Sequence, residues 1–346
     1  MFKKVAPVFL ILILVTLFFT YYYNNKVKEQ KLNNILDQMR LTLKSQLKTH
    51  QMDDLQIALM LSKNKGLIDA LENDDEDLGY KIISDISKTV QESTGKRIRT
   101  QVITSELNIF ARSWDDIYAG MPIGDYRTDL KYFYTHNTPR TSIEVGRRLG
   151  IKATVPLYKD NQLIGYVESI SFFKSITDFF SSIGVDLYVL LDVKYTDTAV
   201  LMMQNLTINN YIVANRNYNY THIQTLRKLD FKTLKLKGIY HKDKKYIFYQ
   251  NMYDGDNKII GGFVFVLPQR YLNYFRNPED NISFLINITR SSLYNIVKEQ
   301  KHEHNKEGRE LFFDESYEKY DKYSKDELIQ MILNRKIVKK IDGKIK

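Results

Sequence analysis

The stretch IKATVPLYKDNQLIGYVESI, residues 151–170, predicts two β-strands joined by a tight turn. Ile151–Tyr158 and Leu163–Ile170 are rich in aliphatic and aromatic residues, which favour strands. Asp160 and Asn161, which separate them, are residue types that favour turns. An antiparallel hairpin is therefore expected here, and the rest of the fold is predicted outward from it.

A related segment follows further along the chain. LYKDNQLIGYV at residues 157–167 is matched by MYDGDNKIIGGFV at residues 252–264, with two residues of difference in length. Each has a Tyr, an Asp/Asn turn, two aliphatic residues and a Gly before an aromatic-rich strand. Duplicated units retain their turn chemistry, so the match predicts two copies of one small α/β module. Chance similarity between two hairpins is the alternative.

Other strands are expected on both sides of the first hairpin. The hydrophobic period changes to two near residue 98, which is typical of strands. The strands predicted in this way are Ile98–Ile103, Leu107–Ser113, Val185–Leu191, Tyr211–Ala214 and Lys237–His241.

The N-terminal residues predict a membrane anchor. Val5–Asn25 contains no charged residue, and a helix needs about 20 apolar residues to cross a bilayer core. The segment ends in the bulky Tyr21–Tyr23, where a cleaved signal peptide would have small residues and an anchor an interfacial aromatic belt. Lys3 and Lys4 before a long domain favour a cytoplasmic N-terminus. We therefore expect a single-pass protein of the inner (cytoplasmic) membrane, with most of its chain periplasmic or extracytoplasmic.

Helices are expected between this anchor and the first strand. Apolar residues recur at three- and four-residue intervals over Lys26–Lys48, which predicts a stalk helix that pairs with a second copy or packs on its own domain. Leu55–Leu61, Leu67–Leu71 and Leu78–Val90 predict shorter helices. The fold class is thus α+β. The predicted divisions are an anchor at 1–25, a stalk with N-terminal helices at 26–97, sheet modules at 98–184 and 185–270, and a charged helical tail at 271–346.

Composition narrows the function classes. The formal charge is +10, but basic and acidic residues are interspersed, so nucleic acid is not an expected partner. The chain has no Cys, which excludes disulfides and thiolate metal sites. His302 and His304 lie two residues apart and would not share a helix face, so no metal is expected. No phosphate-binding loop or catalytic motif is found, and neither a cofactor nor an enzymatic activity is expected.

Four segments carry a family resemblance. They are ARSWDDIYAG (Ala111–Gly120), RTDL (Arg127–Leu130), IEVGRRLGIKATVPLY (Ile143–Tyr158) and IGYVES (Ile164–Ser169). In this order they resemble the double-Cache sensory domain of bacterial sensor kinases, diguanylate cyclases and chemoreceptors. The resemblance implies a long N-terminal helix and two tandem PAS-like modules, the membrane-distal one binding the ligand. Family members normally return through the membrane to an effector domain, and neither feature is recognised in this sequence.

Residues of these segments form a candidate ligand site. Aromatic walls with a few fixed polar groups are typical of small-molecule pockets, and guanidinium groups suit carboxylates. The expected ligand is therefore an organic anion or an amino acid. The candidate residues are Arg112, Trp114, Tyr118, Arg127, Glu144 and Arg147. The structural alternative is that the arginines pair with Asp116, Asp129, Glu144 or Glu168, and that Trp114 serves in packing.

These features predict a membrane-anchored sensor that binds a small metabolite and signals through a separate partner, such as a sensor kinase or chemoreceptor. A homodimer is expected if the stalk pairs with a second copy. Two alternatives remain open. The chain is then either an envelope scaffold without a ligand, or a truncated chemoreceptor, kinase or cyclase that has lost its effector domain.

Overall fold

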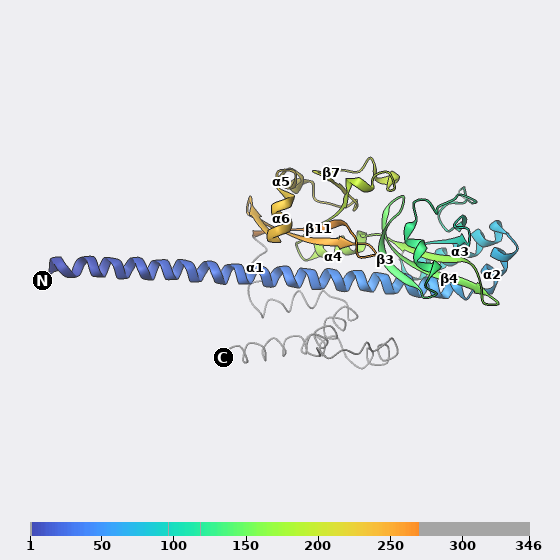
Figure 1. Cartoon of the computed structure of the whole chain (residues 1–346), viewed down its shortest axis with the longest axis horizontal. Helices are drawn as coiled ribbons and strands as arrows, with labels where there is room; N and C mark the ends of the chain where they lie inside the picture. The colour runs from blue at the N-terminus through green and yellow to red at the C-terminus, as the bar shows by residue number, and fades with distance from the viewer. Residues whose placement is uncertain (1, 96, 118, 270–346) are drawn as a thin grey trace, which may run out of the picture. The chain divides into compact units, whose positions relative to one another are not determined.

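The structure is a computed structural model that describes residues 2–95, 97–117 and 119–269 (Figure 1). Residues 1–45 and residues 46–271 belong to two different compact units. The predicted tail at 271–346, with His302 and His304, lies outside the described residues, as does Tyr118.

Three helices precede the first strand in the described part of the chain: α1 (Phe2–Ser62), α2 (Lys65–Glu72) and α3 (Glu76–Thr94). The predicted break between the stalk and Leu55 is wrong, because α1 is continuous and no Pro or Gly interrupts residues 26–62. Asp54 lies within α1 and is a buried carboxylate. It is 4% exposed and accepts hydrogen bonds from the hydroxyls of Ser169 (2.9 Å) and Ser171 (2.5 Å).

Searched over its described residues alone, the structure contains no helix long and apolar enough to cross a membrane. The anchor at 1–25 therefore stays a prediction of the sequence.

The first sheet is antiparallel and has the strand order β2-β1-β5-β4-β3. Its strands are β1 (Arg99–Thr104), β2 (Ile109–Arg112), β3 (Arg140–Val145), β4 (Leu149–Lys159) and β5 (Gln162–Ser171). The predicted turn between β4 and β5 is confirmed, since Asp160 and Asn161 have positive φ values of 47° and 67°. Strand β3 was not predicted as a separate strand, because the sequence offers little to divide it from β4.

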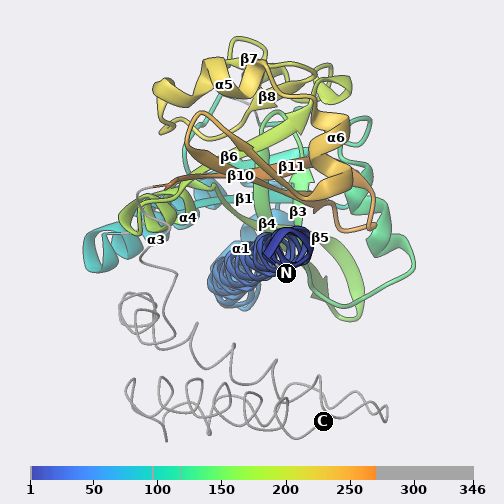
Figure 2. The same cartoon turned by 90° about the vertical axis from the view of Figure 1, so that its left-hand side faces the viewer.

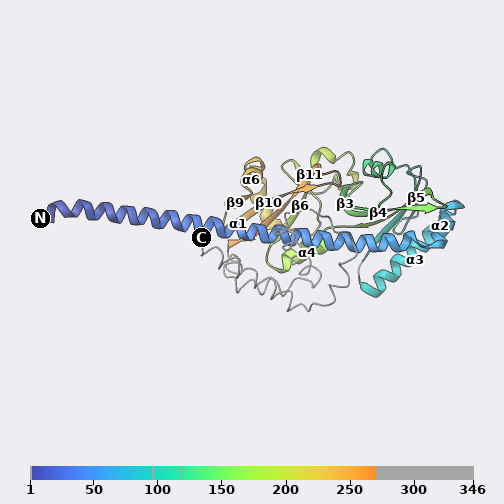
Figure 3. The same cartoon turned by 60° about the horizontal axis from the view of Figure 1, so that its bottom comes forward.

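The two faces of this sheet differ in chemistry. Helices α1, α2 and α3 lie on one side of this sheet (Figure 3). There Leu55, Ala58 and Leu61 of α1 pack with the cross-strand partners Val155 of β4 and Val167 of β5. This apolar burial is the main source of stability for the layer. The opposite face carries a smaller apolar cluster around the 3-10 helix at Thr128–Tyr134 and, beside it, a set of charged residues. Charged side chains are unusual on a sheet face that is partly covered, so this face is the candidate location of a functional site.

The second sheet has the order β7-β8-β6-β11-β10-β9. Its strands are β6 (Asp186–Asp192), β7 (Thr207–Ile208), β8 (Tyr211–Val213), β9 (Ile239–Lys242), β10 (Lys245–Tyr253) and β11 (Ile259–Pro268). Helix α4 (Lys174–Ser182) covers one face, where Phe180 meets Phe265 edge to face at 5.2 Å. Helices α5 (Ile223–Arg227) and α6 (Phe231–Lys237) cover the other (Figure 2).

The segments matched in the sequence occupy equivalent places in the two sheets. Each segment forms the turn end of a hairpin, β4 with β5 and β10 with β11. The second strand of each hairpin also pairs with the first strand of its sheet in chain order, β5 with β1 and β11 with β6. A Cβ on Gly165 would lie 2.3 Å from the Ile103 carbonyl oxygen, and one on Gly261 would lie 1.9 Å from that of Leu190. Only glycine permits so close an approach. The α+β class with antiparallel sheets and a long N-terminal helix is confirmed, while the module boundaries stay a prediction that this equivalence supports.

Candidate functional site: a cationic cavity

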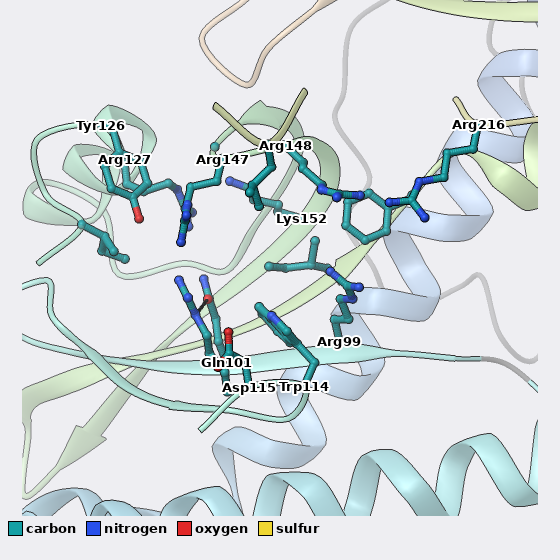
Figure 4. Close-up of a pocket in the computed structure, with 16 residues that line it drawn as sticks. Arg99, Gln101, Trp114, Asp115, Tyr126, Arg127, Arg147, Arg148, Lys152 and Arg216 are labelled. Atoms are coloured by element: carbon teal, nitrogen blue, oxygen red, sulfur yellow. Dashed lines mark hydrogen bonds between the residues drawn. The ribbon is translucent and has the colours of Figure 1, made fainter. Parts of the chain in front are cut away.

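A cavity of about 340 Å³ lies over the charged face of the first sheet (Figure 4). Residues from strands β1, β2, β4 and β5, from the loops between them and from two loops of the second sheet line it. The lining includes Arg99, Gln101, Arg112, Trp114, Asp115, Arg127, Gly146, Arg147, Arg148, Lys152, Phe172, Leu201 and Arg216. Cations dominate this lining, and Asp115 is the single acidic side chain among the lining residues that the structure describes.

Strand alternation explains how charged residues reach this face. Successive side chains of a strand point to opposite faces, and Ala153 and Val155 of β4 belong to the apolar core beneath the helices. Lys152 therefore points the other way, into the cavity. Antiparallel register then aligns Lys152 with Ile170 of β5, and Ile170 with Arg99 of β1. One row of the sheet thus forms the cavity floor.

The next row is a hydrogen-bonded chain across four strands. Arg112, Gln101, Glu168 and Thr154 are consecutive cross-strand partners. Arg112 Nε donates to Gln101 Oε1 at 3.2 Å, and Gln101 Nε2 donates to Glu168 Oε2 at 2.5 Å. The Thr154 hydroxyl donates to Glu168 Oε1 at 2.9 Å. Because Glu168 is fully buried, these bonds offset the cost of removing its carboxylate from water.

Arg127 completes this network. Its Nε and Nη2 donate to the two carboxylate oxygens of Asp129 at 2.8 and 2.7 Å, and its Nη1 donates to Glu168 Oε2 at 3.0 Å. Burial opposes ionisation of Asp129, but the charge and hydrogen bonds of Arg127, together with the charge of Lys152 and a backbone hydrogen bond, outweigh burial and lower the pKa of Asp129 to about 2. The pairing given above as the alternative for Arg127 is therefore what the structure shows. Its guanidinium supports the cavity wall with its donors turned to carboxylates.

Lys152 has a different environment. Its side chain is 4% exposed, and among the described residues its ammonium has neither a hydrogen bond nor a carboxylate within 4.0 Å. Burial, followed by the charge of Arg127, lowers the pKa of Lys152, although Asp129, Glu168 and Glu144 oppose this shift at longer range. A Cβ on Gly146 would lie 2.9 Å from Nζ, so glycine leaves the space that the ammonium occupies. Such a buried donor is best satisfied by an anion in the cavity.

Three further guanidinium groups meet at another part of the cavity: those of Arg99, Arg148 and Arg216 (Figure 4). Burial, followed by the charge of Arg216, lowers the pKa of Arg148. Burial also lowers the pKa of Arg99, and both other arginines contribute to that shift. Within residues 2–95, 97–117 and 119–269, none of the three has a carboxylate within 4.0 Å.

Trp114 forms an aromatic wall between the cations. The Arg99 guanidinium carbon lies 5.4 Å from the centre of the indole ring, and that of Arg112 lies 5.5 Å from it. Arg99 also lies 5.2 Å from the ring of Phe172. Cation–π contacts of this kind orient guanidinium groups without using their hydrogen-bond donors.

Four of the six predicted ligand residues line this one cavity: Arg112, Trp114, Arg127 and Arg147. Tyr118 lies outside the described residues, and Glu144 does not line the cavity. That these residues contact a ligand stays a prediction. Lys152, Arg148, Arg99 and Arg216 were missed. Lys152 had a signal in the sequence, because a lone cation in the apolar run LGIKATVPL of a buried strand usually has a specific role. Arg148 directly follows the predicted Arg147.

Glu144 instead joins the two sheets. Its Oε1 accepts hydrogen bonds from the Ser142 hydroxyl at 2.6 Å and from the backbone N–H of Gly255 in the β10–β11 turn at 3.1 Å. Arg140 reaches the same turn and donates to Asp256 Oδ1 at 2.6 Å. Burial, followed by the charge of Asp129, raises the pKa of Glu144 to about 7, against the opposing effects of Ser142, Lys152 and Arg140.

The raised pKa of Glu144 predicts a pH-dependent stability. A carboxyl that titrates at about 7 when folded and near 4.5 when unfolded favours the folded state below pH 4.5, and this contribution is lost as the pH rises to 7. The loss is at most about 3 kcal/mol. Glu144→Gln retains the acceptor for Gly255 and should abolish this part of the dependence in urea unfolding between pH 5 and 8. The control Glu92→Gln changes an exposed carboxyl, and its free energy of unfolding should depend on pH as that of the wild type does. The same pH dependence in all three proteins would contradict a raised pKa at Glu144.

No protein-family model and no curated protein sequence matches the chain. Among solved structures, the sensor domain of the histidine kinase DctB from Vibrio cholerae shares 13% identity at a TM-score of 0.41, with 68% of this chain and 98% of that one covered. A domain of a putative sensory box/GGDEF family protein from Vibrio parahaemolyticus shares 12% (TM-score 0.43; 71% and 98% covered). The ligand-binding domain of the Pseudomonas fluorescens chemoreceptor CtaA, in complex with L-serine, shares 11% (TM-score 0.40; 70% and 99% covered).

The similar structures are sensor domains of histidine kinases, a GGDEF protein and chemoreceptors, which are the classes of protein that the sequence resemblance names. At these identities and TM-scores the likeness identifies no ligand for this chain.

As to metals, no group of three or more His, Asp or Glu side chains is placed to hold an ion within the part of the chain that the structure describes.

Proposed function

We propose that this chain is a sensor that binds a small organic anion in the cavity over its first sheet. The observation that carries the proposal is the ammonium of Lys152, which is buried, lacks a hydrogen bond within the described residues and faces a cavity lined by guanidinium groups. An unliganded cavity of this kind is electrostatically unfavourable, and a bound carboxylate would form charge-assisted hydrogen bonds there.

The lining favours a carboxylate over a zwitterion. An amino acid needs an acceptor for its ammonium group, and within residues 2–95, 97–117 and 119–269 Asp115 is the one acidic side chain that lines the cavity. Its Oδ1 already accepts the backbone N–H of Ile117 at 3.0 Å. Because Asp115 keeps a second oxygen, an amino acid is the second candidate ligand.

A thermal-shift panel on the full-length chain tests this function. Carboxylates and amino acids would be added at fixed ionic strength, with sodium chloride as the control. A carboxylate present at 100 times its Kd should stabilise the fold by about 2.7 kcal/mol, which corresponds to a rise in Tm of roughly 5–10 °C. Shifts no larger than that of chloride for every compound would contradict the proposal and favour a scaffold without a ligand.

Signalling by such a sensor requires a defined location at the membrane and a partner protein. We propose that the uncharged segment at residues 5–25 anchors the chain with its sheets outside the cytoplasm, and that a separate membrane protein reads ligand occupancy. Occupancy shifts an equilibrium only if the ligand binds its two states with different affinity. Protease accessibility of a C-terminal tag tests the orientation, and cleavage from the cytoplasmic side alone would overturn it.

A further inference from the structure

The cationic residues of the cavity form two groups. We define the Lys152 end as Lys152, Arg112, Arg127 and Arg147, and the Arg216 end as Arg99, Arg148 and Arg216. The members of each group affect one another electrostatically: Arg147 acts on Arg112, Arg127 acts on Lys152, and Arg216 acts on both Arg99 and Arg148. Figure 4 shows Arg127 and Arg147 on one side of the cavity and Arg148 and Arg216 on the other.

The Arg216 end combines residues of both sheets, because Arg99 and Arg148 come from the first sheet and its loops and Arg216 comes from the second. All residues of the Lys152 end come from the first sheet and its loops, whereas Arg216 comes from the loop that follows β8 of the second sheet. This loop is fixed to strand β6. Its buried Asn215 accepts a hydrogen bond from the Val189 N–H at 2.8 Å and donates one to the Leu187 carbonyl at 3.1 Å. Arg216 is thus held at the cavity by the second sheet.

The Arg216 end contains three cations and no acid. Arg99, Arg148 and Arg216 have no carboxylate within 4.0 Å among the described residues, and Arg148 Nε is buried there without a hydrogen-bond partner. Burial, followed by the like charges of neighbouring arginines, lowers the pKa of both Arg99 and Arg148, as expected for cations that meet without a counterion. An anionic group between them would relieve this repulsion and satisfy the free donors.

Building on the proposed function, we infer that the ligand is a dianion that bridges the two sheets: one anionic group is held at the Lys152 end and the second at the Arg216 end. Neutral contacts already join the sheets beside the cavity, because Leu201 N–H donates to the Arg147 carbonyl at 3.0 Å and Leu201 itself lines the cavity. A dianion adds a charged link at Arg216, so that occupancy of the first sheet's cavity is transmitted to the second sheet.

Matched carboxylates test the bridge on the full-length chain. Succinate, glutarate and adipate would be titrated calorimetrically beside butyrate, pentanoate and hexanoate, which have the same chain lengths and one charge less. The best dicarboxylate should bind at least about 10-fold more tightly than its monocarboxylate. Arg216→Gln should remove most of this preference and change monocarboxylate affinity less than about twofold. Lys228→Gln is the control, because Lys228 is an exposed cation at the C-terminal end of α5 and does not line the cavity.

Hydrogen exchange gives an independent readout. Amides of residues 214–219 should gain protection with the best dicarboxylate and not with its monocarboxylate, because only the former reaches Arg216. Equal binding of the two acids, or an Arg216→Gln protein that behaves like Lys228→Gln, would overturn the bridge and leave anion binding intact. Absence of binding by every carboxylate would instead contradict the proposed function, and the bridge with it.

Discussion

Arg127→Met should lower the free energy of unfolding by roughly 3–5 kcal/mol, the largest effect on stability that we expect from one substitution at this site. The guanidinium is 3% exposed and bonds to two carboxylates, Asp129 and Glu168. Its removal leaves both acids buried without their counterion, and the remaining bonds from Gln101 and Thr154 do not neutralise Glu168. Urea unfolding at pH 8 measures the loss.

The pH dependence of this loss identifies its cause. Without Arg127, burial raises the pKa values of Asp129 and Glu168, so that the folded variant takes up protons and loses less stability at pH 5 than at pH 8. Lys174→Met is the matched control, because it breaks an exposed ion pair with Asp178 and should cost no more than about 1 kcal/mol. A loss from Arg127→Met equal to that of the control would mean that the buried network contributes little.

Lys152→Met should weaken binding of the best carboxylate from the panel by about 10- to 100-fold. The same change should leave the unliganded protein as stable as the wild type, or more so. Because burial lowers the pKa of Lys152, its charge disfavours folding in the absence of an anion, and an apolar side chain of similar length removes that cost. Calorimetric titration and urea unfolding of the same preparation measure the two effects.

The opposite directions of these two effects distinguish ligand binding from structure. Lys159→Met, at the far end of the same strand, removes a partly exposed ammonium that pairs with Glu72, and it should change the affinity less than twofold. If Lys152→Met lost stability with unchanged affinity, Lys152 would be a structural residue, and the anion would have to bind elsewhere.

Local signals in the sequence were sufficient for much of the fold. Turn residues and period-two alternation predicted the β1–β2 and β4–β5 hairpins, because strand pairing across a short turn depends on neighbouring residues. The continuity of α1 was missed. Within this helix Asp54 accepts hydrogen bonds from Ser169 and Ser171 of β5, more than a hundred residues away, and local sequence does not contain those contacts.

The sequence by itself determined the chemistry of the candidate site in outline: arginines and a tryptophan in one segment, and hence an anion as ligand. Only the tertiary structure decided which cations are neutralised and which face the cavity without a partner, because Arg127 bonds to two carboxylates whereas Lys152 has none within 4.0 Å among the described residues. It also brought Lys152 and Arg216 to one cavity from different sheets. Charge–charge contacts depend on distance in space, and a pattern of neighbours along the chain does not contain that distance.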